Sequence, residues 1–220
     1  MKTLAIETSG KTFSLAINEN GRDTASLYYD CGQIHSELII SAIERLLKDS
    51  GNNLQNIDQF AVSVGPGSFT GIRIGMTAVK TFAQALNKPV VAIDALSILE
   101  KSFIKKAKEV KLIPVIDALR GEVYVKNGKK IVIKNTDLFI KELKKYKNNL
   151  LLIGNAVISY REKFRKGLGA YSVSLPYTTH MPKANVLAEV AYHSLKSTDY
   201  SKISPLYIRR SWAEENINRR

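Results

Sequence analysis

The sequence predicts an α/β protein of two lobes, each a mixed sheet with helices. Of its 220 residues, 45% are hydrophobic, which is enough for one large core or two small ones. Strand-like and helix-like segments occur in the order three strands, helix, strand, helix, and this order occurs twice. The charge is also divided, with a net of −2 over residues 1–100 and +15 over the rest. We expect an N-terminal lobe over 1–105 and a basic C-terminal lobe with a terminal tail over 106–220.

In the first lobe, short apolar or alternating segments predict strands, and Asn20-Gly21 is typical of a hairpin turn. Longer segments with apolar residues at helical spacing predict helices, and Gly51 is placed to end the first of them. The expected strands are 4–7, 13–18, 24–30, 60–64 and 90–93. The expected helices are 33–50, 69–86 and 95–108.

The second lobe repeats this pattern, with Asn127-Gly128 as its hairpin turn. The expected strands are 111–118, 122–126, 130–133, 150–153 and 170–174. The expected helices are 136–146, a short one after Gly154-Asn155, and 184–196.

Composition excludes several classes of protein. The single cysteine, Cys31, excludes an intramolecular disulfide framework and a cysteine zinc cage. No stretch approaches the roughly 18 apolar residues that a membrane span needs. The N-terminal apolar stretch meets Glu7 too early for a signal-peptide core. We therefore expect a cytoplasmic protein without membrane contact.

A glycine-rich loop follows the strand at 60–64. Gly65, Gly67 and Ser68 lie in the stretch Gly-Pro-Gly-Ser-Phe-Thr-Gly, where glycines permit a sharp turn and Ser68 can cap the next helix. Free amides at a helix N-terminus can hold an anion, so this loop is a candidate anion or nucleotide site. The spacing matches neither a Walker loop nor a dinucleotide fingerprint. The alternative is a structural turn without a ligand.

The helices at 33–50 and 69–86 have unusually broad apolar faces. The apolar arc of the second is about 200° wide, whereas covering a sheet needs little more than about 100°. A surplus apolar surface commonly marks a protein partner, and a self-complementary one favours a homodimer of the isolated chain. The alternative is that the chain itself covers the surface. The candidate interface residues are Leu38, Ile39, Ala42, Ile43, Leu46, Ile72, Met76, Val79 and Lys80.

The positive charge of the second lobe suggests contact with nucleic acid, because lysine attracts phosphate. Lys105, Lys106 and Lys108 are the candidates, and a solvated helix surface is the alternative. Catalytic groups are not recognisable. His35, His180 and His193 lack metal-ligand spacing, and we identify no catalytic residue and no metal ligand.

Five segments, in order along nearly the whole chain, resemble the bacterial TsaB (YeaZ) family. They are Ile6-Glu7-Thr8-Ser9, His35-Ser36-Glu37, Gly65-Pro66-Gly67-Ser68-Phe69-Thr70-Gly71-Ile72-Arg73-Ile74-Gly75, Asp117-Ala118-Leu119-Arg120-Gly121-Glu122-Val123-Tyr124 and Pro205-Leu206-Tyr207-Ile208-Arg209. The resemblance implies the two-lobed actin/Hsp70-like ATPase (ASKHA) fold. It also implies a non-catalytic scaffold or activator related to TsaD, the subunit that transfers a threonylcarbamoyl group to the adenosine beside the tRNA anticodon.

By this resemblance the chain pairs with TsaD through the two N-terminal-lobe helices, TsaE joins the pair, and tRNA is met through the complex. ATP or ADP and metal are expected on the partner subunits, with no cofactor on this chain alone. The two metal-binding histidines of TsaD-like chains align with Ala95 and Leu99, which cannot bind a metal. Glu7-Thr8-Ser9 stands where ATP-hydrolysing members have an Asp-x-Gly loop, so Ser9 joins the candidate nucleotide loop. The alternatives are a glycoprotease-like peptidase and an autonomous ASKHA-type nucleotide-dependent enzyme.

Overall fold

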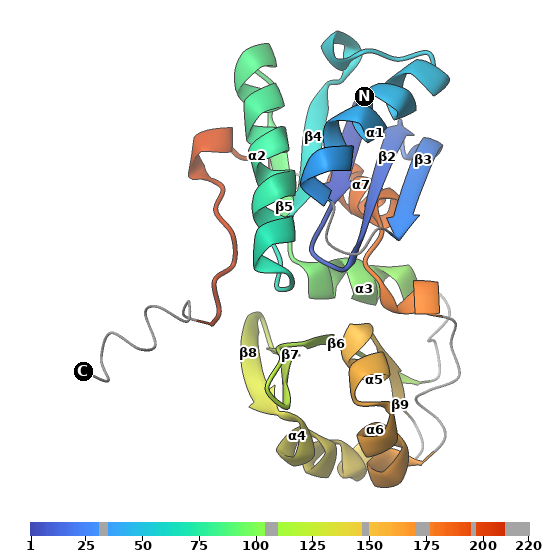
Figure 1. The fold of residues 1–220 in the computed structure, drawn as a ribbon, viewed down its shortest axis with the longest axis vertical. Coiled ribbons are helices and arrows are strands. Elements are labelled where there is room, and N and C mark those ends of the chain that lie inside the picture. Colours follow the sequence, from blue (N-terminus) through green and yellow to red (C-terminus); the bar gives the residue numbers. More distant parts are fainter. Residues whose placement is uncertain (31–34, 104–109, 147–149, 170–176, 195–196, 210–220) are drawn as a thin grey trace, which may run out of the picture.

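The computed structural model describes residues 1–30, 35–103, 110–146, 150–169, 177–194 and 197–209. They form two α/β lobes that follow one another along the long axis of the molecule (Figure 1). Each lobe contains one mixed sheet, as the sequence predicts, and the predicted α/β fold class is confirmed. Within the described residues, no helix is both long and apolar enough to cross a lipid bilayer.

The first sheet has the strand order β3-β2-β1-β4-β5. Its strands are β1 (Lys2–Glu7), β2 (Thr12–Glu19), β3 (Arg22–Asp30), β4 (Gln59–Ser63) and β5 (Val90–Ile93). β1 pairs antiparallel with β2 and parallel with β4, so the carboxyl ends of β1 and β4 lie at the same edge. Almost every residue of β1, β2 and β4 is buried because both faces of this sheet are covered.

Helices α1 (His35–Asp49) and α2 (Phe69–Leu86) cover one face of this sheet. Leu4 and Ile6 of β1 point into that core, whereas Ala5 between them points to the other face. The other face is lined by alanines of three neighbouring strands, which lets a helix approach closely. That helix is α7 (Ala184–Tyr192), which packs there beside α3 (Ala95–Phe103).

The position of α7 differs from the predicted division of the chain at residue 105. The sequence places this helix in the C-terminal lobe, yet it packs against β1 and β2 of the first sheet. The Ala184 amide donates a hydrogen bond to Ser14 Oγ at 2.8 Å, and Thr198 forms a β-bridge with Val90. The physical reason is complementarity between the small side chains of α7 and the alanine-lined sheet face.

The second sheet has the order β8-β7-β6-β9. Its strands are β6 (Lys111–Asp117), β7 (Glu122–Asn127), β8 (Lys130–Asn135) and β9 (Leu150–Ile153). One face packs against α4 (Thr136–Leu143), α5 (Asn155–Ser159) and α6 (Arg161–Leu168) around Val115, Val123 and Phe164. The other face packs against α3, which therefore contacts both lobes.

Several predicted elements of the second half differ in detail. The predicted helix 136–146 consists of α4 followed by a 3-10 turn, and α6 was not expected. The helix predicted over 184–196 ends earlier, at Tyr192, and the predicted strand 170–174 and the end of the helix predicted over 95–108 lie outside the described residues. The 3-10 turns are η1 (Leu54–Asn56), η2 (Lys144–Tyr146), η4 (Tyr177–His180) and η5 (Tyr200–Lys202).

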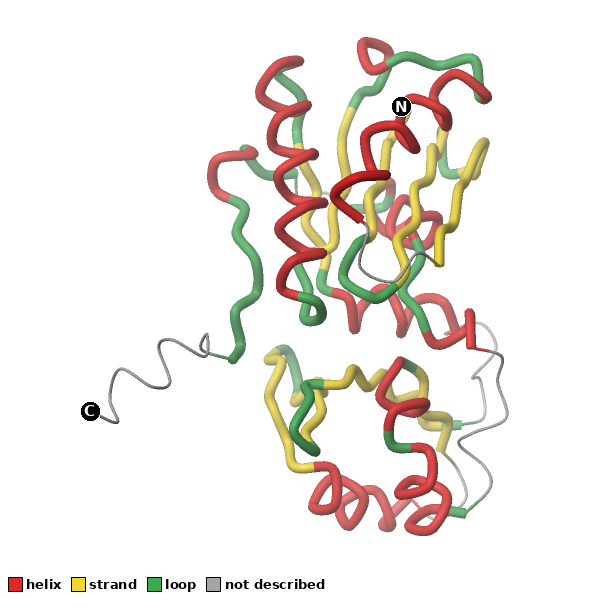
Figure 2. The backbone as a smooth tube through the Cα atoms, in the orientation of Figure 1, coloured by secondary structure: helices red, strands yellow, loops and turns green. Residues whose placement is uncertain are grey.

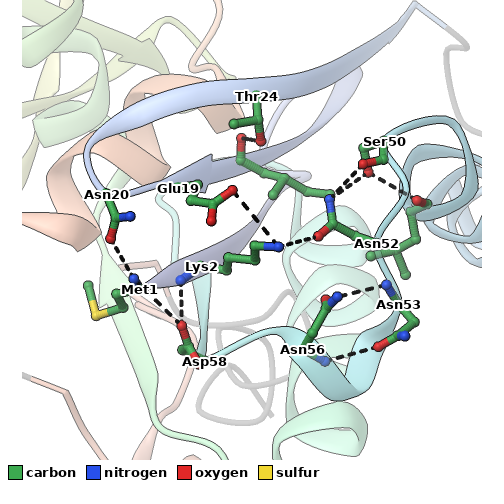
Figure 3. Close-up of polar contacts among 12 residues, drawn as sticks. Met1, Lys2, Glu19, Asn20, Thr24, Ser50, Asn52, Asn53, Asn56 and Asp58 are labelled. Carbon is green, nitrogen blue, oxygen red and sulfur yellow. Dashed lines mark hydrogen bonds and ion pairs between the residues drawn. The ribbon is translucent and has the colours of Figure 1, made fainter.

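A polar network closes the amino end of β1 (Figure 3). The terminal ammonium of Met1 donates to Asn20 Oδ1 at 2.6 Å, and the Lys2 amide donates to Asp58 Oδ2 at 2.6 Å. Lys2 Nζ also donates to Asn52 Oδ1 at 2.9 Å. These hydrogen bonds connect the start of β1 to the β2–β3 turn and to the segment between α1 and β4. The loops at the opposite, carboxyl end of β1 and β4 face the second lobe, as Figure 2 shows.

Candidate functional site

The glycine-rich loop lies between β4 and α2, at the carboxyl end of the first sheet. Ser68 caps α2, since its Oγ accepts a hydrogen bond from the Gly71 amide at 3.1 Å. The Ser68 amide donates to the Ser9 carbonyl at 2.7 Å, and Thr8 Oγ1 donates to the Gly71 carbonyl at 2.7 Å. The glycine loop is thus bonded directly to the loop between β1 and β2.

The glycines of this loop are explained by that contact. A Cβ atom at Gly67 would overlap the Ser9 carbonyl oxygen, and one at Gly71 would overlap the Thr8 carbonyl oxygen. The four predicted anion-loop residues therefore do lie together, but several of their polar groups bond within the chain. The Ser68 amide bonds to Ser9, and the Gly65 carbonyl accepts from the Ala95 amide at 2.7 Å. An anion at this loop stays a prediction.

Glu7 is the buried acid at the end of β1. It is 1% exposed, and its Oε1 accepts from the Ser9 amide at 2.6 Å and from Ser9 Oγ at 2.5 Å. Within the described part of the chain, its Oε2 has no hydrogen-bond partner, nor does the buried Ser63 Oγ. Burial raises the pKa of Glu7 above its ordinary value of 4.5, and the hydrogen bonds from Ser9 lower it by less. Burial therefore disfavours the charged carboxylate relative to the same group in water.

The predicted partner interface lies mainly inside the chain. Seven of its nine side chains are buried between α1, α2 and the first sheet, and they are Ile39, Ala42, Ile43, Leu46, Ile72, Met76 and Val79. Leu38 and Lys80 are half-buried. The alternative stated above therefore applies to these seven residues, because the chain itself covers their side chains. They can support a partner surface only by holding the two helices in place.

The exposed surface of this helix pair includes residues outside the predicted set. Ile40 on α1 is 47% exposed and Phe69 at the start of α2 is 40% exposed. The breadth of the apolar arc is the sequence feature that could have indicated Ile40 and Phe69. A helix packed on a sheet cannot bury side chains over its whole circumference, so a broad arc leaves some of its apolar residues exposed. Among the described large apolar side chains of α1 and α2, these two are the exposed ones.

The residues aligned with a metal site in TsaD-like chains are packed in a core. Ala95 and Leu99 lie on α3, fully buried, in the cluster that contacts the second lobe. Within the described residues, no group of three or more His, Cys, Asp or Glu side chains is arranged to hold a metal ion. His180 is buried, and its Nδ1 accepts from the Gly154 amide at 3.2 Å, while His193 is exposed. The side chain of His35 is outside the description.

The basic residues proposed for nucleic acid, Lys105, Lys106 and Lys108, lie outside the described residues. Other cations of the second lobe form ion pairs on its surface. Lys163 pairs with Asp137 at 2.8 Å, and Lys134 pairs with Glu142. These pairs reduce the local positive field.

Known proteins are similar to this chain in sequence and in fold. The profile of the family described as TsaD, tRNA N6-adenosine threonylcarbamoyltransferase, matches residues 30–214. The Bacillus subtilis tRNA threonylcarbamoyladenosine biosynthesis protein TsaB is 28% identical over 224 residues, covering 97% of this chain and 96% of that protein.

Two solved structures extend the comparison to the fold. A Pseudomonas aeruginosa protein described as similar to peptidase YeaZ has a TM-score of 0.78 at 25% identity, covering 94% of this chain and 99% of that one. The ADPNP-bound activator of the 2-hydroxyisocaproyl-CoA dehydratase from Clostridium difficile has a TM-score of 0.51 at 12% identity, covering 87% and 94%. The second likeness shows the two-lobed ASKHA fold. By the family profile and these relatives, the chain belongs to the TsaD family and, within it, to the TsaB (YeaZ) proteins.

Proposed function

We propose that this chain is a non-catalytic subunit of the cytoplasmic machinery that attaches a threonylcarbamoyl group to the adenosine beside the tRNA anticodon. It would act with TsaD, which performs the transfer, and with TsaE. The names of its relatives support the pathway. The structural observation that carries the non-catalytic role is the packing of Ala95 and Leu99, two apolar side chains, in the core between the lobes.

The carboxyl end of the first sheet supports the same role. The β1–β2 loop and the glycine loop are hydrogen-bonded to each other at the edge of an α/β sheet where ligands commonly bind. Glu7 bonds to Ser9 of its own loop. An enzyme that hydrolyses ATP needs an accessible carboxylate for its magnesium ion, whereas the Glu7 side chain is 1% exposed. ATP, ADP and metal would then be bound by the partner subunits.

The proposed partner surface is the exposed side of α1 and α2, with Ile40 and Phe69 as its apolar side chains. It would bind TsaD in the complex and a second copy of this chain in isolation. Exposed apolar residues next to charged ones, such as Glu44 and Arg73, are the usual composition of a surface that alternates between water and a partner. Contact with tRNA would come through the assembled complex.

Reconstitution tests the proposal. Purified TsaD and TsaE are incubated with unmodified tRNA, ATP and the threonylcarbamoyl donor, with and without this chain. We expect modified adenosine only when this chain is present together with TsaD, and none with this chain alone. Modification, ATP hydrolysis or peptide cleavage by the isolated chain would overturn the non-catalytic role and favour the autonomous enzyme or the peptidase.

A further inference from the structure

The C-terminal segment contacts both lobes. After α7 the chain forms η5 against α2 and then runs beside α2 toward the second lobe (Figure 1). The Leu206 amide donates to the Val64 carbonyl at 2.8 Å, at the end of β4. Three residues later, Arg209 forms an ion pair with Glu122 at the start of β7 in the second lobe. A stretch of four residues therefore spans the distance between the lobes.

Tyr207 is the anchor on the first lobe. Its ring stacks on Phe69 with a centroid distance of 4.6 Å. The Arg73 guanidinium lies 4.2 Å from the Phe69 ring centroid, and Arg73 Nε donates to the Tyr207 hydroxyl at 3.0 Å. Phe69 and Arg73 are four residues apart and so share one face of α2. These contacts give Tyr207 one defined position although it is partly exposed.

Strand β7 is the part of the second lobe that the C-terminal segment contacts. Val123 and Val125 point into the second-lobe core, so Glu122, Tyr124 and Lys126 share its opposite face. Tyr124 packs there with residues of α3. Glu122 at the start of β7 pairs with Arg209, which also lowers the pKa of the Tyr124 hydroxyl, although burial raises that pKa by more.

The other end of β7 is held by α3. Lys126 Nζ forms an ion pair with Glu100 Oε2 at 2.5 Å and donates to Ser97 Oγ at 2.9 Å. Ser97 in turn donates to Asp94, which caps the start of α3. The face of β7 is thus attached at one end to α3 and at the other end to the C-terminal segment.

We propose that residues 205–209 form a strap that fixes the angle between the two lobes, attached to α2 through Tyr207 and to β7 through Arg209. A single packed helix such as α3 permits a hinge or shear movement of one lobe against the other. A second attachment at the far end of the same strand removes that freedom. The strap consists of contacts within the chain and does not depend on the proposed function.

The strap has a consequence for partner binding, and this consequence does rest on the proposed function. Phe69 and Arg73 belong to the exposed side of α2. A partner that binds to Phe69 and Arg73 competes with Tyr207 for contact with these side chains. Partner binding therefore changes the angle between the lobes, and that angle in turn changes the affinity for the partner.

The strap is tested by measuring the distance between the lobes in the isolated chain. Spin labels on cysteines replacing the exposed Thr81 of α2 and Leu138 of α4, in a Cys31→Ser background, report this distance by pulsed electron paramagnetic resonance. We expect the double variant Tyr207→Ala/Arg209→Ala to widen the distance distribution at least twofold. The exposed pair Tyr28→Ala/Arg165→Ala, which lies away from the strap, is the matched control and should leave the width unchanged.

Two further measurements keep the result interpretable. A label pair within the first lobe, at Ile40 and Thr81, should keep its distance in every variant, which shows that the lobe is folded. Arg209→Glu alone should widen the distribution, and the exchange Arg209→Glu/Glu122→Arg should restore it. An unchanged interlobe width in the double variant, with the lobe folded, would overturn the strap. Widening that the charge exchange does not reverse would overturn the role of the Arg209–Glu122 pair.

Discussion

The α1–α2 pair has an inner side that faces the first sheet and an outer side that faces solvent, and both sides carry apolar residues. On the inner side, Ile43, Met76 and Val79 are packed against the first sheet and one another. On the outer side, Ile40 and Phe69 are each exposed over at least 40% of their surface. The inner side therefore stabilises the fold, whereas the outer side is available to bind another protein. Substitutions on the two sides should affect different measurements.

The comparison also explains the breadth of the apolar arcs. A helix that contacts a sheet and a neighbouring helix buries two adjoining stripes of its surface, so an arc wider than about 100° does not by itself mean an exposed patch. α2 contacts β4, β1 and α1, and its buried residues occupy most of the arc. The surplus that remains for a partner is small.

The largest expected effect is on the inner side, at Met76. Met76→Asp places a carboxylate in a core without a charged partner, so we expect a loss of about 3–5 kcal/mol in the free energy of unfolding. The matched variant is Thr77→Asp, one residue along and exposed, which should change it by no more than about 0.5 kcal/mol. Urea denaturation measures both. A Met76→Asp chain of normal stability that no longer binds TsaD would move Met76 to the partner surface.

The next effect is at the start of α2, where it meets the β1–β2 loop. Gly71→Ala forces a Cβ onto the Thr8 carbonyl, and the displaced backbone should lower the free energy of unfolding by about 2–3 kcal/mol. Gly10→Ala is the control, because a Cβ there makes ordinary contacts, and it should have little effect. The comparison is made by thermal and urea denaturation. Equal stabilities would show that the two loops are not held as closely as described.

A smaller effect is expected on the outer side, at Ile40. Ile40→Asp should leave the free energy of unfolding within about 0.5 kcal/mol, because the side chain is largely in water. The affinity for TsaD, measured by calorimetry, should fall about tenfold, which corresponds to about 1.4 kcal/mol. Ile158→Asp, on an exposed position of α5, is the matched control and should bind normally. Full affinity of the Ile40 variant would remove α1 from the proposed surface.

The last prediction is a pH dependence of stability from Glu7, the buried acid at the end of β1. Its pKa is raised in the folded chain, so above pH 4.5 the unfolded chain releases this proton first and stability falls as the pH rises through the raised pKa. The slope from one group is at most about 1.4 kcal/mol per pH unit. Glu7→Gln should remove this part of the slope in urea denaturation between pH 4.5 and 7.5. The exposed Glu44→Gln is the control, and parallel curves for wild type and Glu7→Gln would contradict the raised pKa of Glu7.

Local patterns were sufficient for most elements of the first lobe. The strands and helices there begin and end within about two residues of the prediction, wherever both ends are described. The Asn20-Gly21 turn adopts the expected left-handed geometry, with φ of 51° and 85°. In the second lobe Asn127 is the last residue of β7 and pairs with Lys130, so the turn there consists of Gly128 and Lys129. These features depend on residues next to one another in the chain, and so does the family motif around the glycine loop.

The candidate site was predicted less completely, for a physical reason. The sequence predicts a sharp turn and a candidate anion loop at Gly65, Gly67 and Ser68, and the anion stays a prediction. It did not predict that Gly67 and Gly71 lie against the carbonyl groups of Ser9 and Thr8, about 60 residues earlier in the chain. The positions of glycines in the sequence indicate where another group can lie close to the backbone. They do not indicate whether that group is a ligand or another part of the chain.

Sequence alone therefore established the α/β class, most of the elements and the family, because periodicity, turn chemistry and motifs are properties of adjacent residues. Tertiary packing decided that α7 returns to the first sheet, that Met76 is covered and Ile40 is not, and that Tyr207 reaches Phe69. Each of these contacts joins elements whose pairing depends on the shape of the whole fold. The exposure of a side chain follows from those distant pairings, and no local pattern encodes it.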